Sequence, residues 1–219
     1  MSLPTSNGSG WREHLLLFGR FLRNPRSIGA ISPSSPALAE AMVALLPLDG
    51  AERIVELGPG TGVLTAALLR RVAPTARVLA IDREPLFVER LREQWPEVES
   101  VCASAAALSI LAAERNLLPL DHIVSGLPFA SLPAAVTARI LEAIEQTLRP
   151  GGTFTTFQYV HAYRLPHAVA FRRDLSGRLG AWPARMLVMK NFPPAYVLTW
   201  KRDEGAVERR PGGTGLASS

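Results

Sequence analysis

Short apolar runs alternate with amphipathic segments along most of the chain, and this alternation predicts the fold. Strands are expected at Arg53–Leu57, Arg77–Ile81, Val98–Cys102, Asp121–Ser125, Thr153–Val160 and Ala195–Lys201. Helices are expected at Trp11–Asn24, Pro36–Leu46, Val63–Val72, Glu84–Gln94, Ala105–Arg115 and Pro133–Leu148, the last ended by Pro150-Gly151-Gly152. Strands that alternate with helices favour a doubly wound α/β fold with a mostly parallel sheet.

The same pattern contains no internal linker, so we expect residues 11–202 to form one domain. Residues 1–10 then form a flexible leader and residues 203–219 a flexible tail. A hydrophobic content of 47% argues against a disordered chain. No apolar run reaches the roughly 18 residues of a membrane-spanning helix, and no signal peptide is evident. The single cysteine, Cys102, excludes an internal disulfide and suits the cytoplasm.

The expected helix at 11–24 is amphipathic. Trp11, Leu15, Phe18 and Leu22 share one stripe at helical spacing, and arginines face away from it. Such a helix fits a membrane interface, although the same stripe could pack on the domain. The net charge of +5 favours anionic partners, either nucleic acid or acidic lipid, or it reflects an ordinary arginine-rich surface.

A second candidate surface lies between the last two expected strands, where basic and aromatic residues are interleaved. Its members are Phe171, Arg172, Arg173, Arg178, Trp182, Arg185 and Lys190. This mixture suits phosphate headgroups at a bilayer and equally suits RNA. A solvated insertion with no binding role is the alternative.

The strongest chemical signal is the segment Glu56–Gly62, which reads E-L-G-P-G-T-G between a strand and a helix. A dinucleotide site requires G-x-G-x-x-G, and the third glycine position is here Val63 or Thr65, depending on the starting glycine. The observed spacing instead resembles the first motif of class I S-adenosylmethionine (SAM) methyltransferases. A plain tight turn remains the alternative for the glycines, and Glu56 could simply cap the following helix.

Asp82 follows the second strand, 20 residues after Gly62. A carboxylate there can accept both ribose hydroxyls of a nucleoside, which supports a nucleoside cofactor without choosing between SAM and NAD. Class I methyltransferases often carry an acid at the end of the third strand for the adenine amine. Ser104 occupies that place here, and its hydroxyl is a weaker acceptor.

The fourth strand ends in Ser125-Gly126-Leu127-Pro128-Phe129. Methyltransferases that act on amines often have N-L-P-Y or N-P-P-Y here, where carbonyls and one polar side chain orient the attacking nitrogen. Gly126 replaces the amide, so Ser125 or backbone carbonyls would do the orienting. Phe129 keeps the aromatic ring and could contact an ammonium, or it could lie in the core.

Three further segments resemble bacterial phospholipid N-methyltransferases, the enzymes that methylate phosphatidylethanolamine. They are F-L-R-N-P-R-S-I-G-A-I-S-P-S-S-P-A-L over 21–38, F-T-T-F-Q-Y over 154–159, and N-F-P-P-A over 191–195. The resemblance runs from about residue 15 to residue 201, while E-L-G-P-G-T-G is also shared with ribosomal RNA adenine dimethylases. It implies a Rossmann-like seven-stranded sheet with an antiparallel last strand and extra N-terminal helices. It further implies successive methyl transfers by an enzyme bound peripherally at the inner face of the cell membrane, with a phospholipid substrate.

Together the motifs and the resemblance give a set of expected site residues. For SAM, and its product S-adenosylhomocysteine, they are Glu56, Gly58, Gly60, Thr61, Gly62, Asp82, Arg83, Ser104 and Ser125. For the lipid they are Ser32, Leu127, Pro128, Phe129, Tyr159 and Arg185. Tyr159 and Ser125 are the expected catalytic residues, because a substrate ammonium must lose a proton before attack; a carboxylate or solvent could also take it.

Other functions stay open at this level. An RNA adenine dimethylase usually carries a further helical domain, so RNA is not favoured as a partner, nor is DNA. A small-molecule N- or O-methyltransferase and a catalytically inactive SAM-fold module that only binds lipid are further alternatives. We expect no metal, because His14, His122, His161 and His167 are scattered without a metal-binding spacing.

Overall fold

A computed structural model describes residues 35–205, whose seven strands form one sheet. The strands are β1 (Arg53–Leu57), β2 (Arg77–Asp82), β3 (Glu99–Cys102), β4 (Leu120–Ser125), β5 (Leu148–Tyr159), β6 (Ala184–Val188) and β7 (Ala195–Lys201). Their order is β3-β2-β1-β4-β5-β7-β6. β7 runs antiparallel to both of its neighbours, and the other pairs are parallel. The expected Rossmann-like sheet with an antiparallel last strand is therefore confirmed.

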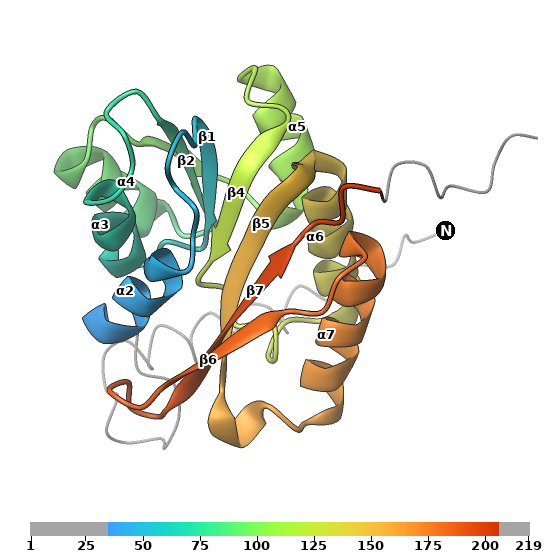
Figure 1. The fold of residues 1–219 in the computed structure, drawn as a ribbon. Helices are drawn as coiled ribbons and strands as arrows, with labels where there is room; N and C mark the ends of the chain where they lie inside the picture. The colour runs from blue at the N-terminus through green and yellow to red at the C-terminus, as the bar shows by residue number, and fades with distance from the viewer. Residues whose placement is uncertain (1–34, 206–219) are drawn as a thin grey trace, which may run out of the picture.

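Helices cover both faces of this sheet (Figure 1). They are α2 (Pro36–Ala44), α3 (Val63–Leu69), α4 (Pro85–Gln94), α5 (Leu108–Glu114), α6 (Ala134–Thr147) and α7 (Pro166–Leu179), with short 3-10 turns η1 (Ala105–Ala107) and η2 (Val160–Ala162). One core packs α2, α3 and α4 on one face of the sheet. The other core packs α5, α6 and α7 on the opposite face.

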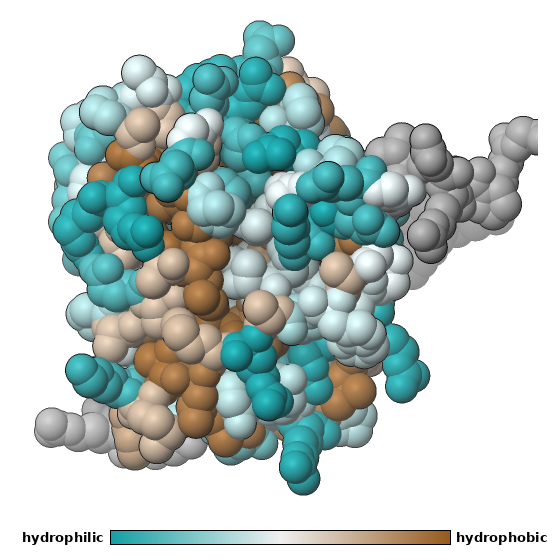
Figure 2. Space-filling view, in the orientation of Figure 1, coloured by the Kyte–Doolittle hydropathy of each residue, from teal (hydrophilic) through white to brown (hydrophobic). Residues whose placement is uncertain are grey.

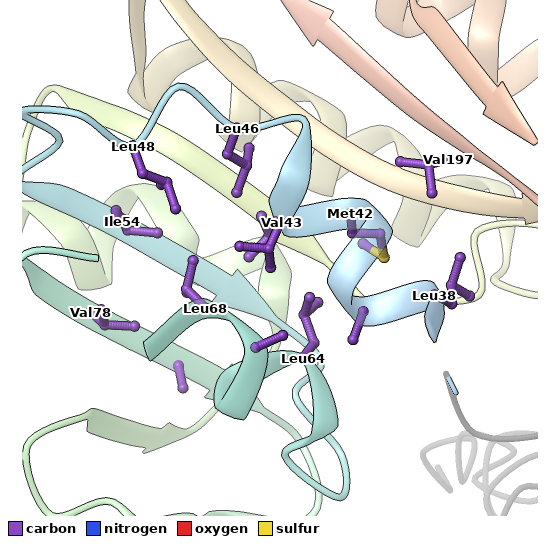
Figure 3. Packing of buried hydrophobic residues seen from close by; sticks show 14 of the residues in the cluster. Leu38, Met42, Val43, Leu46, Leu48, Ile54, Leu64, Leu68, Val78 and Val197 are labelled. Carbon is purple, nitrogen blue, oxygen red and sulfur yellow. The ribbon is translucent and has the colours of Figure 1, made fainter. Parts of the chain in front are cut away.

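Helix α2 is the additional N-terminal helix, and it closes the first of these cores. Ser35 caps it, since the Ser35 Oγ accepts a hydrogen bond from the Leu38 N–H at 3.2 Å. Val43 lies toward Leu68 of α3, whereas Leu38 lies on the side of Val197 in β7 (Figure 3). The helix therefore bridges the glycine-turn half of the sheet and the β6–β7 half.

Strand β5 begins five residues earlier than the sequence pattern indicated. Pro150-Gly151-Gly152 was expected to terminate a helix, but these residues lie within β5. The Gly151 N–H donates to the Arg202 carbonyl and the Arg202 N–H donates to the Gly152 carbonyl. This pairing with the residue that follows β7 keeps the segment extended.

Two elements between β5 and β7 were not expected from the sequence: helix α7 and strand β6. The apolar residues of α7, Ala168, Phe171, Leu175 and Leu179, do recur at spacings of three and four and are buried. Pro166, Gly177 and four basic side chains obscured that period. β6 is an edge strand whose side chains are mostly exposed, so it lacks a clear alternation.

Several expectations concern residues outside 35–205 and stay predictions. They are the leader 1–10, the amphipathic helix 11–24, the substrate residue Ser32 and most of the tail 203–219. Within the described part of the chain, no helix is long and apolar enough to cross a bilayer.

Candidate cofactor and acceptor site

The carboxyl ends of β1, β2, β3, β4 and β5 meet at one edge of the sheet. β1 leads into α3 on one face, whereas β4 leads into α6 on the other. β1 and β4 are neighbours, so the chain diverges between them to opposite faces. Open α/β sheets bind ligands at such a position, and most of the residues expected from the sequence lie at this edge.

The glycine turn after β1 has a left-handed backbone at each glycine, with φ of 69° at Gly58, 55° at Gly60 and 81° at Gly62. Two of the glycines are also sites of close approach. A Cβ on Gly58 would lie 2.5 Å from Leu127, and one on Gly62 would lie 2.3 Å from the Trp95 ring. A Cβ on Gly60 would meet nothing within 4 Å. The turn is packed at both ends and open at its centre.

Asp82 ties the end of β2 to this turn. Its Oδ2 accepts a hydrogen bond from the Gly60 N–H and its Oδ1 accepts one from the Glu84 N–H, both at 3.0 Å. Burial raises the pKa of Asp82, although these N–H groups oppose the shift. Each carboxylate oxygen keeps a further lone pair, so Asp82 can hold the turn and still accept hydroxyl groups from a ligand.

Glu56 is fully buried at the end of β1. Its Oε2 accepts a hydrogen bond from the Thr65 hydroxyl at 2.7 Å, which links β1 to α3. Its Oε1 is buried without a hydrogen-bond partner. Burial raises the pKa of Glu56 to about 8. Glu56 can therefore both attach α3 and bind a ligand, because Oε2 bonds Thr65 while Oε1 is left for the ligand.

These groups fit SAM, which carries a ribose diol, an ammonium and a sulfonium. Asp82 has free lone pairs for the diol, and the unpartnered Glu56 Oε1 is a buried acceptor for a cationic group. The open centre of the turn leaves room above Gly60. When bound, SAM supplies an electrophilic methyl group, while Glu56, Asp82 and the turn bind and orient it.

The remaining expected cofactor residues are placed less centrally. Ser104 caps η1, with its Oγ accepting a hydrogen bond from the Ala106 N–H at 3.3 Å, and it keeps its own proton to donate. Arg83 is exposed, and its carbonyl faces the Cys102 thiol at 3.7 Å. Thr61 is exposed and, with the end of α4, lines a hollow of about 310 Å³. Glu56 and Asp82 do not line that hollow.

The segment after β4 interlocks with the glycine turn. The Gly126 N–H donates to the Leu57 carbonyl at 2.9 Å. A Cβ on residue 126 would lie 2.6 Å from the Gly58 carbonyl oxygen. No side chain fits there, which explains physically why this position is a glycine. Leu127, expected to contact substrate, packs over Gly58.

Ser125 holds this turn from inside. Its Oγ accepts a hydrogen bond from the Leu127 N–H at 3.2 Å, and its carbonyl accepts one from the Thr156 hydroxyl at 3.1 Å. The residue is fully buried. Its oxygens thus shape the segment in this structure, and the catalytic and cofactor roles expected of it stay predictions.

Phe129 lies in the core, as the alternative interpretation of the sequence held. It is 5% exposed and stacks on Phe171 of α7 with ring centroids 4.5 Å apart. Its ring also meets Phe154 edge-on at 6.2 Å. In this structure it presents no face to a substrate ammonium. Pro128 is half-buried beside it, and its carbonyl accepts the Ser131 N–H at 2.8 Å.

Tyr159 ends β5 and is buried, with its ring parallel to that of His161 at a centroid distance of 5.7 Å. Burial raises its pKa to about 12, so the phenol keeps its proton near neutral pH and does not accept one as phenolate.

Arg185, on β6, lies over the rings of Tyr163 and Tyr196, at 5.4 and 4.8 Å from their centroids. The structure therefore places Arg185 on an aromatic platform.

The basic and aromatic surface expected between β5 and β7 is not one surface. Phe171 and Arg172 are buried, and the Arg172 guanidinium bonds Gln158 and the Tyr163 carbonyl. Arg178 is paired with Asp174 and Glu145. Trp182 and Lys190 are exposed but lie beyond opposite ends of β6. Helix α7, which the sequence pattern did not indicate, buries Phe171 and Arg172 and places Arg178 where it pairs with acids.

No sequence pattern indicates that Trp95 and Leu127 pack against the glycine turn. Trp95 follows α4 and carries no motif, so nothing in its sequence surroundings indicated contact with Gly62. The described residues also contain no group of three His, Cys, Asp or Glu placed to hold a metal ion.

Known proteins similar to this chain include methyltransferases. Residues 54–152 match the family model described as a methyltransferase domain. The chain is 33% identical over 146 residues to an ornithine lipid N-methyltransferase from Singulisphaera acidiphila, covering 65% of this chain and 76% of that protein. It is 38% identical over 96 residues to a probable ribosomal RNA small subunit methyltransferase A from Thermococcus onnurineus, covering 43% of this chain and 31% of that protein.

Solved structures share the fold. The 1,6-didemethyltoxoflavin-N1-methyltransferase of Burkholderia thailandensis, crystallised with S-adenosylhomocysteine, superposes with a TM-score of 0.59 at 20% identity, covering 93% of each chain. Magnesium protoporphyrin IX methyltransferase from Synechocystis, with bound SAM, gives a TM-score of 0.64 at 15% identity, covering 90% of this chain and all of that one. SAM is the cofactor of the family. The chain belongs to the class I SAM-dependent methyltransferases.

Proposed function

We propose that this methyltransferase transfers methyl groups to the amino group of a polar lipid at a membrane surface. The observation that carries the proposal is the similarity to the ornithine lipid N-methyltransferase, which extends over 146 residues and three quarters of that protein. The N-terminal and C-terminal segments that resemble phospholipid N-methyltransferases support the same acceptor class. Phosphatidylethanolamine and its methylated intermediates are the substrates proposed first, and an ornithine lipid is the second candidate.

The chemistry asked of the protein is alignment and exclusion of water. The lipid ammonium must lose a proton before attack. Bound SAM would supply the methyl carbon, whose bond to sulfur would break as the amine nitrogen bonds to it, so that S-adenosylhomocysteine leaves as a neutral thioether. Tyr159, with its raised pKa, serves better as a hydrogen-bond donor or acceptor than as a base, so we assign the departing proton to solvent. Because residue 126 is glycine, backbone carbonyls of the 125–129 segment orient the nitrogen.

An RNA substrate has weaker support. The similarity to the ribosomal RNA enzyme covers less than a third of that protein, and the E-L-G-P-G-T-G motif resembles motifs of several acceptor classes. A location at the inner face of the cell membrane belongs to the same proposal as the lipid acceptor.

Incubation of the full chain with methyl-labelled SAM and separate vesicles of phosphatidylethanolamine or ornithine lipid tests the proposal. We expect label in the extracted lipid, and the vesicle that is labelled identifies the headgroup. Total RNA serves as the competing acceptor. A folded protein that binds SAM and labels neither lipid would contradict the proposal, and labelled adenine in RNA would replace it.

A further inference from the structure

The turn between β6 and β7, residues 189–194, exposes two large apolar side chains. Phe192 is 85% exposed and Met189 is 69% exposed, which makes them two of the three most exposed large hydrophobic residues in 35–205. Trp182, the third, lies beyond the other end of β6. The hairpin projects at the lower margin of the sheet (Figure 1), and Figure 2 shows apolar surface gathered on that part of the molecule.

This exposure does not come from a loosely held loop. Asn191 is 1% exposed, and its Nδ2 donates to the Pro193 carbonyl at 2.6 Å. Its Oδ1 accepts the Ser35 N–H at 3.2 Å. The Pro194 carbonyl accepts the Val160 N–H at 2.9 Å. The backbone of the turn is therefore anchored to the N-terminal cap of α2 and to the end of β5.

Basic side chains also occur in this part of the chain. Residues 160–201 contain seven lysines and arginines and one acid, Asp174, although Arg172 is buried and Arg178 is paired with Asp174 and Glu145. Lys190 is exposed between Met189 and Phe192, and Arg164 is exposed after η2. Val160, four residues before Arg164, and Leu165, directly after it, are also exposed. Apolar tips interleaved with cations are the composition of protein surfaces that enter the headgroup region of anionic bilayers.

The turn lies at the edge of the sheet that carries the cofactor groups. Ala195, the first residue of β7, pairs with Tyr159, the last residue of β5. β5 is followed in the sheet by β4 and then β1, so three strand spacings of about 4.8 Å separate β7 from the glycine turn's strand. A surface on which this turn rests would face the acceptor segment as well.

We propose that the β6–β7 turn docks the enzyme on an anionic lipid bilayer. Met189 and Phe192 enter the boundary between headgroups and acyl chains, and Lys190 contacts lipid phosphates. This inference deepens the lipid acceptor proposed above and rests on it. A projecting turn with a cation between two apolar side chains fits a bilayer better than a protein groove, because the lysine head can reach the aqueous phosphate layer while its neighbours are buried.

Binding to vesicles of equal parts phosphatidylglycerol and phosphatidylcholine tests the docking directly. We expect the full-length double variant Met189→Ser/Phe192→Ser to bind about tenfold or more weakly than wild type. Ile110→Ser is the matched control, since Ile110 is 62% exposed on α5, and it should bind like wild type. Unchanged binding by the double variant, or an equal loss in the control, overturns the proposal.

A fluorescent probe shows what covers the turn. In a Cys102→Ser background, Phe192→Cys and Ile110→Cys are each labelled with an environment-sensitive dye. A blue shift on adding vesicles at residue 192 and none at residue 110 supports docking. If the emission at residue 192 is already blue-shifted and does not change when vesicles are added, residues 1–34 or a second copy of the chain cover the turn. That result overturns the docking proposal. Dilution distinguishes the two, because only a second copy dissociates.

Failure of the docking and failure of the lipid acceptor give different results. Wild-type lipid methylation with undiminished vesicle binding of the double variant overturns the docking and leaves the acceptor intact. Vesicle binding that depends on Met189 and Phe192, without lipid methylation, supports the docking and counts against the acceptor.

Discussion

The glycine turn and the β6–β7 turn lie at the same edge of the sheet. Side-chain hydrogen bonds hold both turns, but the two turns expose different groups. A polar side chain holds each one: the partly buried Asp82 accepts a hydrogen bond from the Gly60 N–H of the glycine turn, and the buried Asn191 bonds backbone groups at the β6–β7 turn. The glycine turn lacks side chains at its centre, so a ligand can approach the backbone. The β6–β7 turn presents Phe192 and Met189 to solvent. The comparison shows that hydrogen bonds fix the backbone of both turns in a similar way. The groups that each turn exposes then determine which ligand it can bind.

The largest expected effect concerns the packed end of the glycine turn. Gly62→Ala places a Cβ 2.3 Å from the Trp95 ring at a φ of +81°. We expect it to lower the free energy of unfolding by about 3 kcal/mol, combining backbone strain and a clash. Gly60→Ala, with a φ of +55° and no atom within 4 Å, should lose only about 1 kcal/mol. Chemical denaturation measures both, and equal losses would show that the Trp95 contact is unimportant.

Asp82→Asn sharpens the distinction between holding the turn and binding the cofactor. Asparagine keeps one oxygen as an acceptor but loses the charge and one acceptor oxygen. We expect the Kd for SAM to rise by about 10- to 100-fold, as expected for loss of charge-assisted hydrogen bonds. Calorimetry with SAM and S-adenosylhomocysteine measures this change. A Kd within error of wild type would mean that Asp82 serves the turn alone.

Glu56 gives the glycine turn a pH dependence that the β6–β7 turn lacks. Because burial raises the pKa of Glu56 in the folded protein to about 8, above its ordinary value of 4.5, the folded protein holds a proton that the unfolded chain releases in that window. The stability of the ligand-free protein therefore falls as pH rises from about 5 to 8, by up to about 1.4 kcal/mol per unit. Glu56→Gln should flatten this slope in denaturation experiments. A wild-type stability that rises over that window, with no change in Glu56→Gln, would contradict the assignment.

Asn191→Ala tests the frame of the β6–β7 turn without touching its exposed side chains. Loss of two hydrogen bonds should loosen the turn and lower stability by about 1 kcal/mol. Vesicle binding should weaken while SAM binding stays unchanged, because the cofactor groups lie on β1 and β2. Parallel vesicle and calorimetric titrations measure the two, and an equal loss in both would show that the turns are coupled.

The smallest effect is a second pH dependence, from the buried His122. Its Nδ1 lies 2.7 Å from the Thr153 hydroxyl and its Nε2 lies 3.0 Å from the Pro47 carbonyl. Burial lowers the pKa of His122, so the unfolded chain binds a proton more readily and stability falls as pH drops below about 6.5. His122→Gln should lose this acid-side decline in thermal unfolding, and an unaltered decline would assign it to other groups.

Local patterns were sufficient for the parallel half of the fold. The apolar runs of β1, β2 and β4, the glycine spacing and Asp82 are consecutive or closely spaced in sequence, so periodicity and turn chemistry identify them. The same patterns failed for α7 and β6, because the helix carries many basic residues and the strand lies at an edge. They also grouped Arg172 and Arg178 with an exposed surface, although packing paired both of them.

The sequence by itself determined the chemistry at the edge of the sheet where the cofactor groups lie. It shows which residues end each strand, and it shows where glycines allow the left-handed backbone of the turn. Only the tertiary structure decided how each side chain is used. It placed Phe129 in the core, closed position 126 to any side chain through the Gly58 carbonyl, and left Glu56 Oε1 unpartnered. It also held Phe192 outward. These outcomes depend on contacts between segments far apart in the chain, and such contacts set burial and approach distances that no local pattern contains.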